Sequence, residues 1–174
     1  MPHLVLTAIG DDRAGLVSSL ADIVASHGGN WEESQLAELA GKFAGIVVVS
    51  VSADRVDEFV AATRTLDGLL DVSVYPGTVE NAGDDSTRLT LAVLGNDHPG
   101  IVHELSTVLS AHGLSIERMT TNTREAPMAG GLLFEATMDV RVPPQTDVTD
   151  VRVELERIAA ELFVDLGIDQ VQST

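Results

Sequence analysis

The sequence predicts an α+β fold of two tandem βαββαβ units, each an antiparallel four-stranded sheet with both helices on one face. Three observations lead to this prediction. The first part of the chain recurs further along at a constant offset, each copy opens with strand-like alternation, and a helix-like apolar spacing follows. A length of 174 residues suits one domain or two small ones, so the repeat decides between them.

The repeat aligns residues 4–30 with residues 89–115 without a gap, an offset of 85 residues. Identical pairs include Leu4 and Leu89, Leu6 and Leu91, Gly10 and Gly95, Asp12 and Asp97, Gly15 and Gly100, and His27 and His112. A period this long indicates a duplicated domain and not a solenoid repeat. We expect a first domain at 1–76, a linker rich in Gly, Asn and Asp at 77–87, and a second domain at 88–174.

Each copy begins with a strand, a turn and a helix. Apolar residues alternate over 4–8 and over 89–93, which is the period of a strand with one buried face. Glycine-bounded turns follow at 10–15 and 95–100. The next apolar positions have the spacing of an amphipathic helix. They are Leu16, Val17, Leu20, Ile23 and Val24 in one copy, and Ile101, Val102, Leu105, Val108 and Leu109 in the other. His-Gly pairs at 27–28 and 112–113 are typical helix ends.

The rest of each copy diverges in sequence but keeps the same order of elements. Strands are expected at 31–39, 45–51 and 71–75 in the first copy, and at 116–124, 132–142 and 168–172 in the second. Second helices fall within 56–66 and 151–162, and Asp54 and either Asp147 or Thr149 are plausible N-caps. The order βαββαβ is the ferredoxin-like arrangement. Because many functions share it, the fold alone does not identify this one.

Charge and composition exclude several classes of function. The formal net charge is −17, from 27 acidic and 10 basic residues, and such a surface repels phosphate backbones. Arg118 and Arg124 come nearest to a basic patch, but Glu117 and Glu125 flank them, so we expect no direct nucleic-acid binding. The acidity either keeps the protein soluble or fits a basic protein partner. With no cysteine there are no disulfides and no thiolate chemistry. Short apolar runs and the lack of a signal-like N-terminus lead us to expect a cytoplasmic protein without a membrane partner.

The turns after the first strands are the candidate functional positions. A helix start offers free N–H groups to an anion, and a neighbouring carboxylate, Asp12 or Asp97, can hold an ammonium. Together they suit an α-amino acid. The alternative is that the aspartates are only helix caps and the glycines only turn residues.

The sequence gives less support to metal binding, catalysis or phosphate binding. His98 and His103 lack the spacing that places two metal ligands on one helix face, so we expect no metal and no cofactor. The serines form no catalytic pattern, and residues 10–15 lack the ending of a phosphate loop. Trp31 is more typical of packing. We therefore expect a protein that is not an enzyme.

The strand, the G-[DN]-D-x-[AP]-G-[LI]-V turn and the helix ending in H-G resemble the start of an ACT domain, twice in this chain. The tandem pair is similar to the glycine cleavage system transcriptional repressor family. Related ACT modules precede the catalytic domain of formyltetrahydrofolate deformylases. The first turn departs from the commoner pattern, with Ala14 where the second has Pro99. The resemblance implies a regulator that senses glycine or a similar small amino acid and binds a transcription factor or a metabolic enzyme. Two alternatives stay open: a structural interaction module that binds no ligand, and an accessory subunit of a metabolic enzyme.

The resemblance also suggests how the two units assemble. The second strands, 31–39 and 116–124, should be sheet edges that pair with each other, leaving the opposite sheet face or the helix layer for a homodimer. Each ligand site would then combine residues of both units. One hybrid contains Asn96, Asp97 and Gly100 with Asn30 and Trp31; the other contains Asp11, Asp12 and Gly15 with Ser115 and Ile116. We favour the first, because Pro99 stiffens its helix start and the Asn30 amide both donates and accepts hydrogen bonds.

Overall fold

The computed structural model describes residues 1–78, 86–128 and 130–171, and the chain divides into two compact units, 1–81 and 82–174. Most of the expected linker, 77–87, lies outside the described residues. No helix in the described ranges is long and apolar enough to span a membrane.

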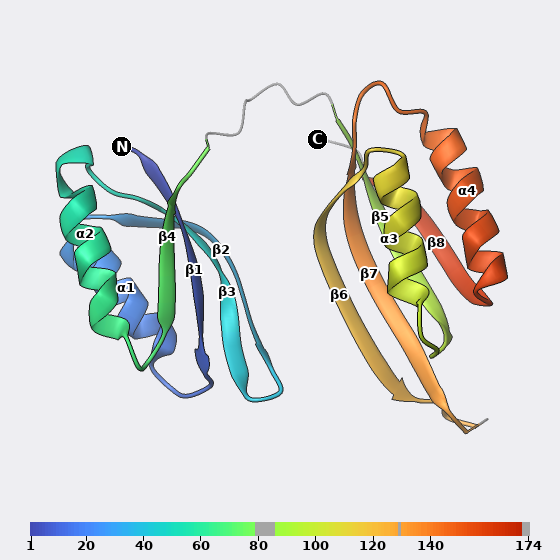
Figure 1. The fold of residues 1–174 in the computed structure, drawn as a ribbon, viewed down its shortest axis with the longest axis horizontal. Coiled ribbons are helices and arrows are strands. Elements are labelled where there is room, and N and C mark those ends of the chain that lie inside the picture. Colours follow the sequence, from blue (N-terminus) through green and yellow to red (C-terminus); the bar gives the residue numbers. More distant parts are fainter. Residues whose placement is uncertain (79–85, 129, 172–174) are drawn as a thin grey trace. The chain divides into compact units, whose positions relative to one another are not determined.

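The first unit has the predicted βαββαβ order. Its elements are β1 (His3–Asp11), α1 (Leu16–Ser26), β2 (Asn30–Leu39), β3 (Lys42–Ser50), the 3-10 turn η1 (Ala53–Arg55), α2 (Val56–Thr63), the 3-10 turn η2 (Arg64–Leu66) and β4 (Asp71–Pro76). The antiparallel sheet has the strand order β2-β3-β1-β4, so β2 is an edge as expected. Figure 1 shows both helices on one face of the sheet.

The second unit repeats this architecture. Its elements are β5 (Thr87–Asn96), α3 (Ile101–Ala111), β6 (Ser115–Glu125), β7 (Leu132–Val142), α4 (Val148–Glu161) and β8 (Val164–Val171). The strand order is β6-β7-β5-β8, again antiparallel, with β6 at the edge and both helices on one face (Figure 1). The tandem ferredoxin-like prediction is therefore confirmed.

The core of each unit lies between its sheet and its helices. Leu4, Leu6 and Ala8 of β1 are buried at every second position, as are Leu89, Leu91 and Val93 of β5. Both first helices bury most of the expected positions, and Ile23 is half-buried against the core. Val17 is 45 % exposed and Val102 is 37 % exposed, because they lie at the margin of the apolar face. These two valines belong to the predicted helical spacing but lie outside the core.

Gly10 and Gly95 are strand residues, which corrects their assignment to the turns. Each continues the core-facing row of its strand, at the place where the chain enters the last strand of the sheet. A Cβ on Gly10 would lie 2.4 Å from the Leu69 carbonyl oxygen, and one on Gly95 would lie 2.6 Å from Val164 Cγ1. Close backbone approach, and not a turn, requires glycine here.

The helix caps follow the prediction in part. The Asp147 carboxylate accepts a hydrogen bond from the Thr149 N–H at 2.7 Å and caps α4. Asp54 does not cap α2, because a 3-10 turn that starts after Ser52 precedes the helix. Gly28 and Gly113 have φ of +65° and +73°, the left-handed residues expected after the first helices. The last strand of the second unit starts at Val164, earlier than predicted, and the predicted end at Gln172 lies outside the described residues.

The sheet faces opposite the helices differ between the units. In the first unit this outer face carries Ile9, Ile46 and Tyr75, which are each more than half exposed. In the second unit ion pairs lie toward both ends of this face. Glu117 lies 3.1 Å from Arg88 and 3.5 Å from Arg141, and Arg124 pairs with Glu135. The first unit has ion pairs on this face as well, Glu32 with His3 and Asp11 with Lys42, so the two faces differ mainly in their exposed apolar side chains.

Candidate functional site

Each candidate loop ends in a glycine that starts the following helix. Gly15 and Gly100 are the N-cap residues of α1 and α3, with φ of +95° and +102°, in the left-handed region that favours glycine. Within the described residues no side chain caps either helix. Asp12 and Asp97 are therefore not helix caps, and the first-turn N–H groups keep their capacity to bind an anion.

The backbone of each aspartate is anchored while its side chain is exposed. The Asp12 N–H donates to the Gly41 carbonyl at 2.9 Å, and the Asp97 N–H donates to the Leu132 carbonyl at 2.8 Å. Both acceptors lie at the adjoining ends of the second and third strands. Because this bond fixes the main chain, a carboxylate is presented at a defined place beside a helix N-terminus in both units.

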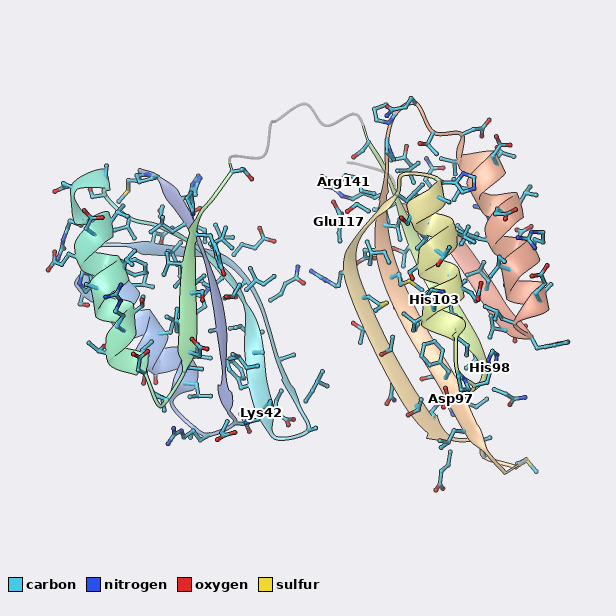
Figure 2. All side chains as sticks on the ribbon, viewed as in Figure 1. Lys42, Asp97, His98, His103, Glu117 and Arg141 are labelled. Atoms are coloured by element: carbon cyan, nitrogen blue, oxygen red, sulfur yellow. The ribbon has the colours of Figure 1, made fainter. Side chains whose placement is uncertain are left out.

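The residue after each aspartate ties its loop to the start of the last strand. The Arg13 guanidinium donates to the Gly68 carbonyl at 3.1 Å. In the second unit His98 Nε2 lies 2.9 Å from the Leu162 carbonyl, and Nδ1 lies 3.1 Å from the Pro99 carbonyl. Hydrogen bonds to Leu162 and then Pro99 raise the pKa of His98, because both nitrogens can donate only in the imidazolium. Figure 2 shows His98 beside Asp97 at this end of the unit.

The two loops differ in the residue that ends their first strand. In the first unit Asp11 forms an ion pair with Lys42, and the hydrogen bond and charge of Lys42 lower the pKa of Asp11. In the second unit the equivalent residue is the neutral Asn96, which lies opposite Leu133. The Asp11 carboxylate is thus engaged by a lysine, whereas the second loop has no such internal pair among its described residues. This difference favours the second loop as a ligand site.

The remaining predicted site residues lie at the other end of each sheet. Asn30 pairs with Ser50, which pairs with His3, whereas Asp11 pairs with Lys42. The length of a strand, roughly 26 Å, therefore separates Asn30 and Trp31 from the first loop. Ser115 and Ile116 are separated from the second loop in the same way, and Figure 2 shows Glu117 and Arg141 at that far end. One unit therefore does not bring its own loop to the start of its own second strand.

Local packing explains the side chains at these strand starts. Trp31 is half-buried against the core of the first unit, in agreement with the packing prediction, and Asn30 is exposed. Ile116 is half-buried and Ser115 exposed, and both line a shallow groove between α3 and β6 with Ser106 and Ser110.

Two repeated features of this region were missed in the sequence. The first is the carbonyl-binding residue of the loop, Arg13 or His98. The second is a glutamate at a β-bulge near the start of the second strand: Glu32 lies 3.1 Å from His3, and Glu117 lies 3.1 Å from Arg88. All these pairs are related by the 85-residue offset, so the repeat already contained the signal.

Metal binding finds no support in the part of the chain that the structure describes, where no group of three His, Asp or Glu residues is placed to hold an ion. His103 is exposed on α3, and His98 is committed to two carbonyl groups. What the geometry offers is a helix N-terminus for an anion and a carboxylate for a cation, in duplicate.

Comparison with known proteins agrees with this architecture. Residues 2–68 and residues 89–147 each match a model of the ACT domain. The chain is 24 % identical over 172 residues to the glycine cleavage system transcriptional repressor of Escherichia coli (strain K12), covering 97 % of this chain and 90 % of that protein.

Solved structures of similar fold cover nearly the whole chain. An unknown protein from Galdieria sulphuraria has a TM-score of 0.87 and 30 % identity over 98 % of this chain and 99 % of its own. A putative glycine cleavage system transcriptional repressor has a TM-score of 0.72 and 16 % identity over 99 % of this chain and 98 % of its own. With two ACT matches in one chain, the protein belongs to the ACT domain family, as a tandem pair that resembles the glycine cleavage system transcriptional repressors.

Proposed function

We propose that this protein senses glycine or a similar small amino acid and controls a transcription factor or a metabolic enzyme by direct contact, in the cytoplasm. As a tandem ACT-domain chain it is a regulatory protein and not an enzyme. One observation carries the ligand proposal. An uncapped helix start with a left-handed glycine lies beside an exposed aspartate, and the arrangement occurs in both units. Resemblance to a repressor supports the regulatory part.

The ligand site that we favour is the second loop. The Asp97 carboxylate takes the ammonium, and the N–H groups at the start of α3, after Gly100, take the carboxylate. Pro99 stiffens this helix start, and the neutral Asn96 leaves the loop without the Asp11–Lys42 pair of the other unit. In the full proposal the ligand also meets Asn30 and Trp31, which requires the edge strands β2 and β6 to pair. That pairing stays a prediction.

Titration calorimetry with glycine and a panel of small amino acids tests the site. Loss of a charge-assisted hydrogen bond costs about 1.5–3 kcal/mol, or about 10- to 150-fold in affinity. Asp97→Ala and Asn30→Ala should each weaken binding by such a factor. Asp12→Ala is the matched control, because Asp12 has the same loop geometry in the unit that we do not favour. If the Asp97 and Asn30 variants bind as tightly as the parent, the hybrid site is wrong.

Two further results separate this function from its alternatives. No heat with any amino acid would identify a structural interaction module instead of a sensor. Affinity purification from the native cell should recover a transcription factor or a metabolic enzyme, and recovery of only a stoichiometric enzyme subunit would identify an accessory subunit.

A further inference from the structure

Lys42 distinguishes the first candidate loop from the second. It is the only lysine of the chain and the first residue of β3. Only two residues, Ala40 and Gly41, join β2 to β3, and both have positive φ, of +52° and +80°. Two-residue turns with positive φ at both positions fix the register of the strands that they join. Lys42 is therefore held directly opposite Asp11, the last residue of β1.

This turn supplies the first loop with both a hydrogen bond and a charge. The Gly41 carbonyl accepts a hydrogen bond from the Asp12 N–H at 2.9 Å, and the Lys42 ammonium pairs with the Asp11 carboxylate. Figure 2 shows Lys42 at this end of the first unit. The side chains of Lys42 and Asp11 are 61 % and 76 % exposed, so a dissolved amino acid would meet them. An alkylammonium, the group that an amino-acid ligand carries, is thus already bound in this loop.

The equivalent pair in the second unit is neutral. Asn96 lies opposite Leu133 there, and the next residue across the sheet, Arg124, is paired with Glu135 at 2.6 Å. Asp97 has no ion-pair partner within the part of the chain that the structure describes. The ammonium of a ligand therefore meets a carboxylate without such a partner in the second loop, but a competing ammonium in the first.

We propose that Lys42 closes the first loop to an amino acid and so leaves the second loop as the stronger ligand site of the chain. The inference rests on the proposed function, because it explains which of two similar loops the ligand uses. The Lys42 ammonium holds the residue next to Asp12 and repels the ammonium of a ligand. Repulsion between like charges at a partly solvated surface weakens binding about 10-fold. Removal of this one charge therefore opens the first loop.

Chemical modification of the full chain tests the proposal, because only one lysine is present. Acetylation with an N-hydroxysuccinimide ester removes the charge of Lys42, whereas reductive dimethylation keeps it. Both treatments also modify the N-terminal amine, which precedes the end of β1 opposite the loop. Glycine, alanine and serine are titrated in turn, and the NMR amide signals of Gly15 and Gly100 report the two loops separately. The acetylated chain should bind at the first loop about 10-fold more tightly than the dimethylated chain, with equal binding at the second.

Variants test the same charge without modification. Lys42→Met removes the charge and Lys42→Arg keeps it, so only the first of these should open the first loop. Transfer of the pair to the other unit, by Asn96→Asp together with Leu133→Lys, should weaken binding at the second loop about 10-fold. Leu133→Met is the matched control for this transfer and should leave binding unchanged. If a variant fails to fold, the two chemically modified samples still decide, because they retain every residue of the chain.

The outcomes separate this proposal from the sensor function. Equal first-loop binding by the acetylated and dimethylated chains refutes the role of Lys42 alone, as does an untreated chain that binds equally at both loops. Binding at the first loop only after acetylation, with none at the second loop, supports the role of Lys42 and refutes the favoured ligand site. A chain that binds none of the amino acids at either loop, before or after acetylation, refutes both proposals.

Discussion

Gly95→Ala should destabilise the second unit although it adds only one methyl group. Gly95 faces the core from β5, between Phe134 on one neighbouring strand and Val164 on the other. The added Cβ would lie 2.6 Å from Val164 Cγ1, closer than real Cβ contacts allow, and 3.0 Å from its Cα, which is a tight contact. Val164 is buried and branched at Cβ, so its side chain has little room to rotate away, and the start of β8 must move.

The size of the effect follows from two opposing contributions. Overpacking a core costs about 1–3 kcal/mol, while replacing glycine returns about 0.4–1 kcal/mol through the unfolded state. At the middle of both ranges the net loss is about 1.3 kcal/mol, or roughly 5–10 °C in melting temperature for a unit of this size. Gly167→Ala in β8 is the matched control. Its Cβ would have its nearest contact at 3.8 Å, with Ala92, so we expect no loss.

Denaturant unfolding followed by circular dichroism, with amide exchange to assign the transition to the second unit, measures both variants. The reasoning fails if Gly95→Ala is as stable as the parent, or if Gly167→Ala loses as much. Because Gly95 adjoins Asn96, the variant should also weaken binding at the proposed ligand loop.

Three further predictions follow from the site and the helix ends. Folding raises the pKa of His98 above its ordinary value of 6.5, so the stability that His98 contributes is present below pH 6.5 and is lost as the pH rises through the raised pKa. His98→Arg, which copies Arg13, should remove this pH dependence of the melting temperature. A variant whose melting temperature keeps the pH profile of the parent would refute the argument. Asp147→Ala should cost about 0.5–2 kcal/mol in urea unfolding, whereas Asp54→Ala should cost nothing; equal losses would contradict the cap assignment. The isolated protein should not shift a promoter fragment in a gel at physiological salt, and salt-sensitive binding would count against us.

Periodicity and the internal repeat were sufficient to predict the fold. Strand-like alternation begins at Leu4 and Leu89, and helical spacing begins at Leu16 and Ile101. Both patterns depend only on residues close together in the chain, so the sequence alone is enough to recognise them. The offset of 85 then doubled the evidence for the first strand, the turn and the first helix of each unit. The candidate loops could be predicted for the same reason, because a glycine before an amphipathic helix is a local pattern.

What sequence reasoning missed depends on contacts between distant segments. Gly10 is a glycine because the Leu69 carbonyl approaches it, and no local pattern at Gly10 contains that information. Aspartate is a common N-cap residue, yet the Asp12 N–H donates to the Gly41 carbonyl and Gly15 is the N-cap of α1. Asp54 fails as a cap because the chain first makes a 3-10 turn. In each case a tertiary or neighbouring backbone contact overrode a correct local preference.

The outer faces of the two sheets expose different amounts of apolar surface, so the two duplicated units should differ in self-association. Cleavage between the two units would release two proteins whose tendency to self-associate can be compared. The first, with Ile9, Ile46 and Tyr75 on its open face, should self-associate as its concentration rises. The second, with the Glu117 ion pairs at one end of that face, should self-associate less under the same conditions. Duplication has thus supplied one scaffold twice, with outer faces that differ in how much apolar surface they expose.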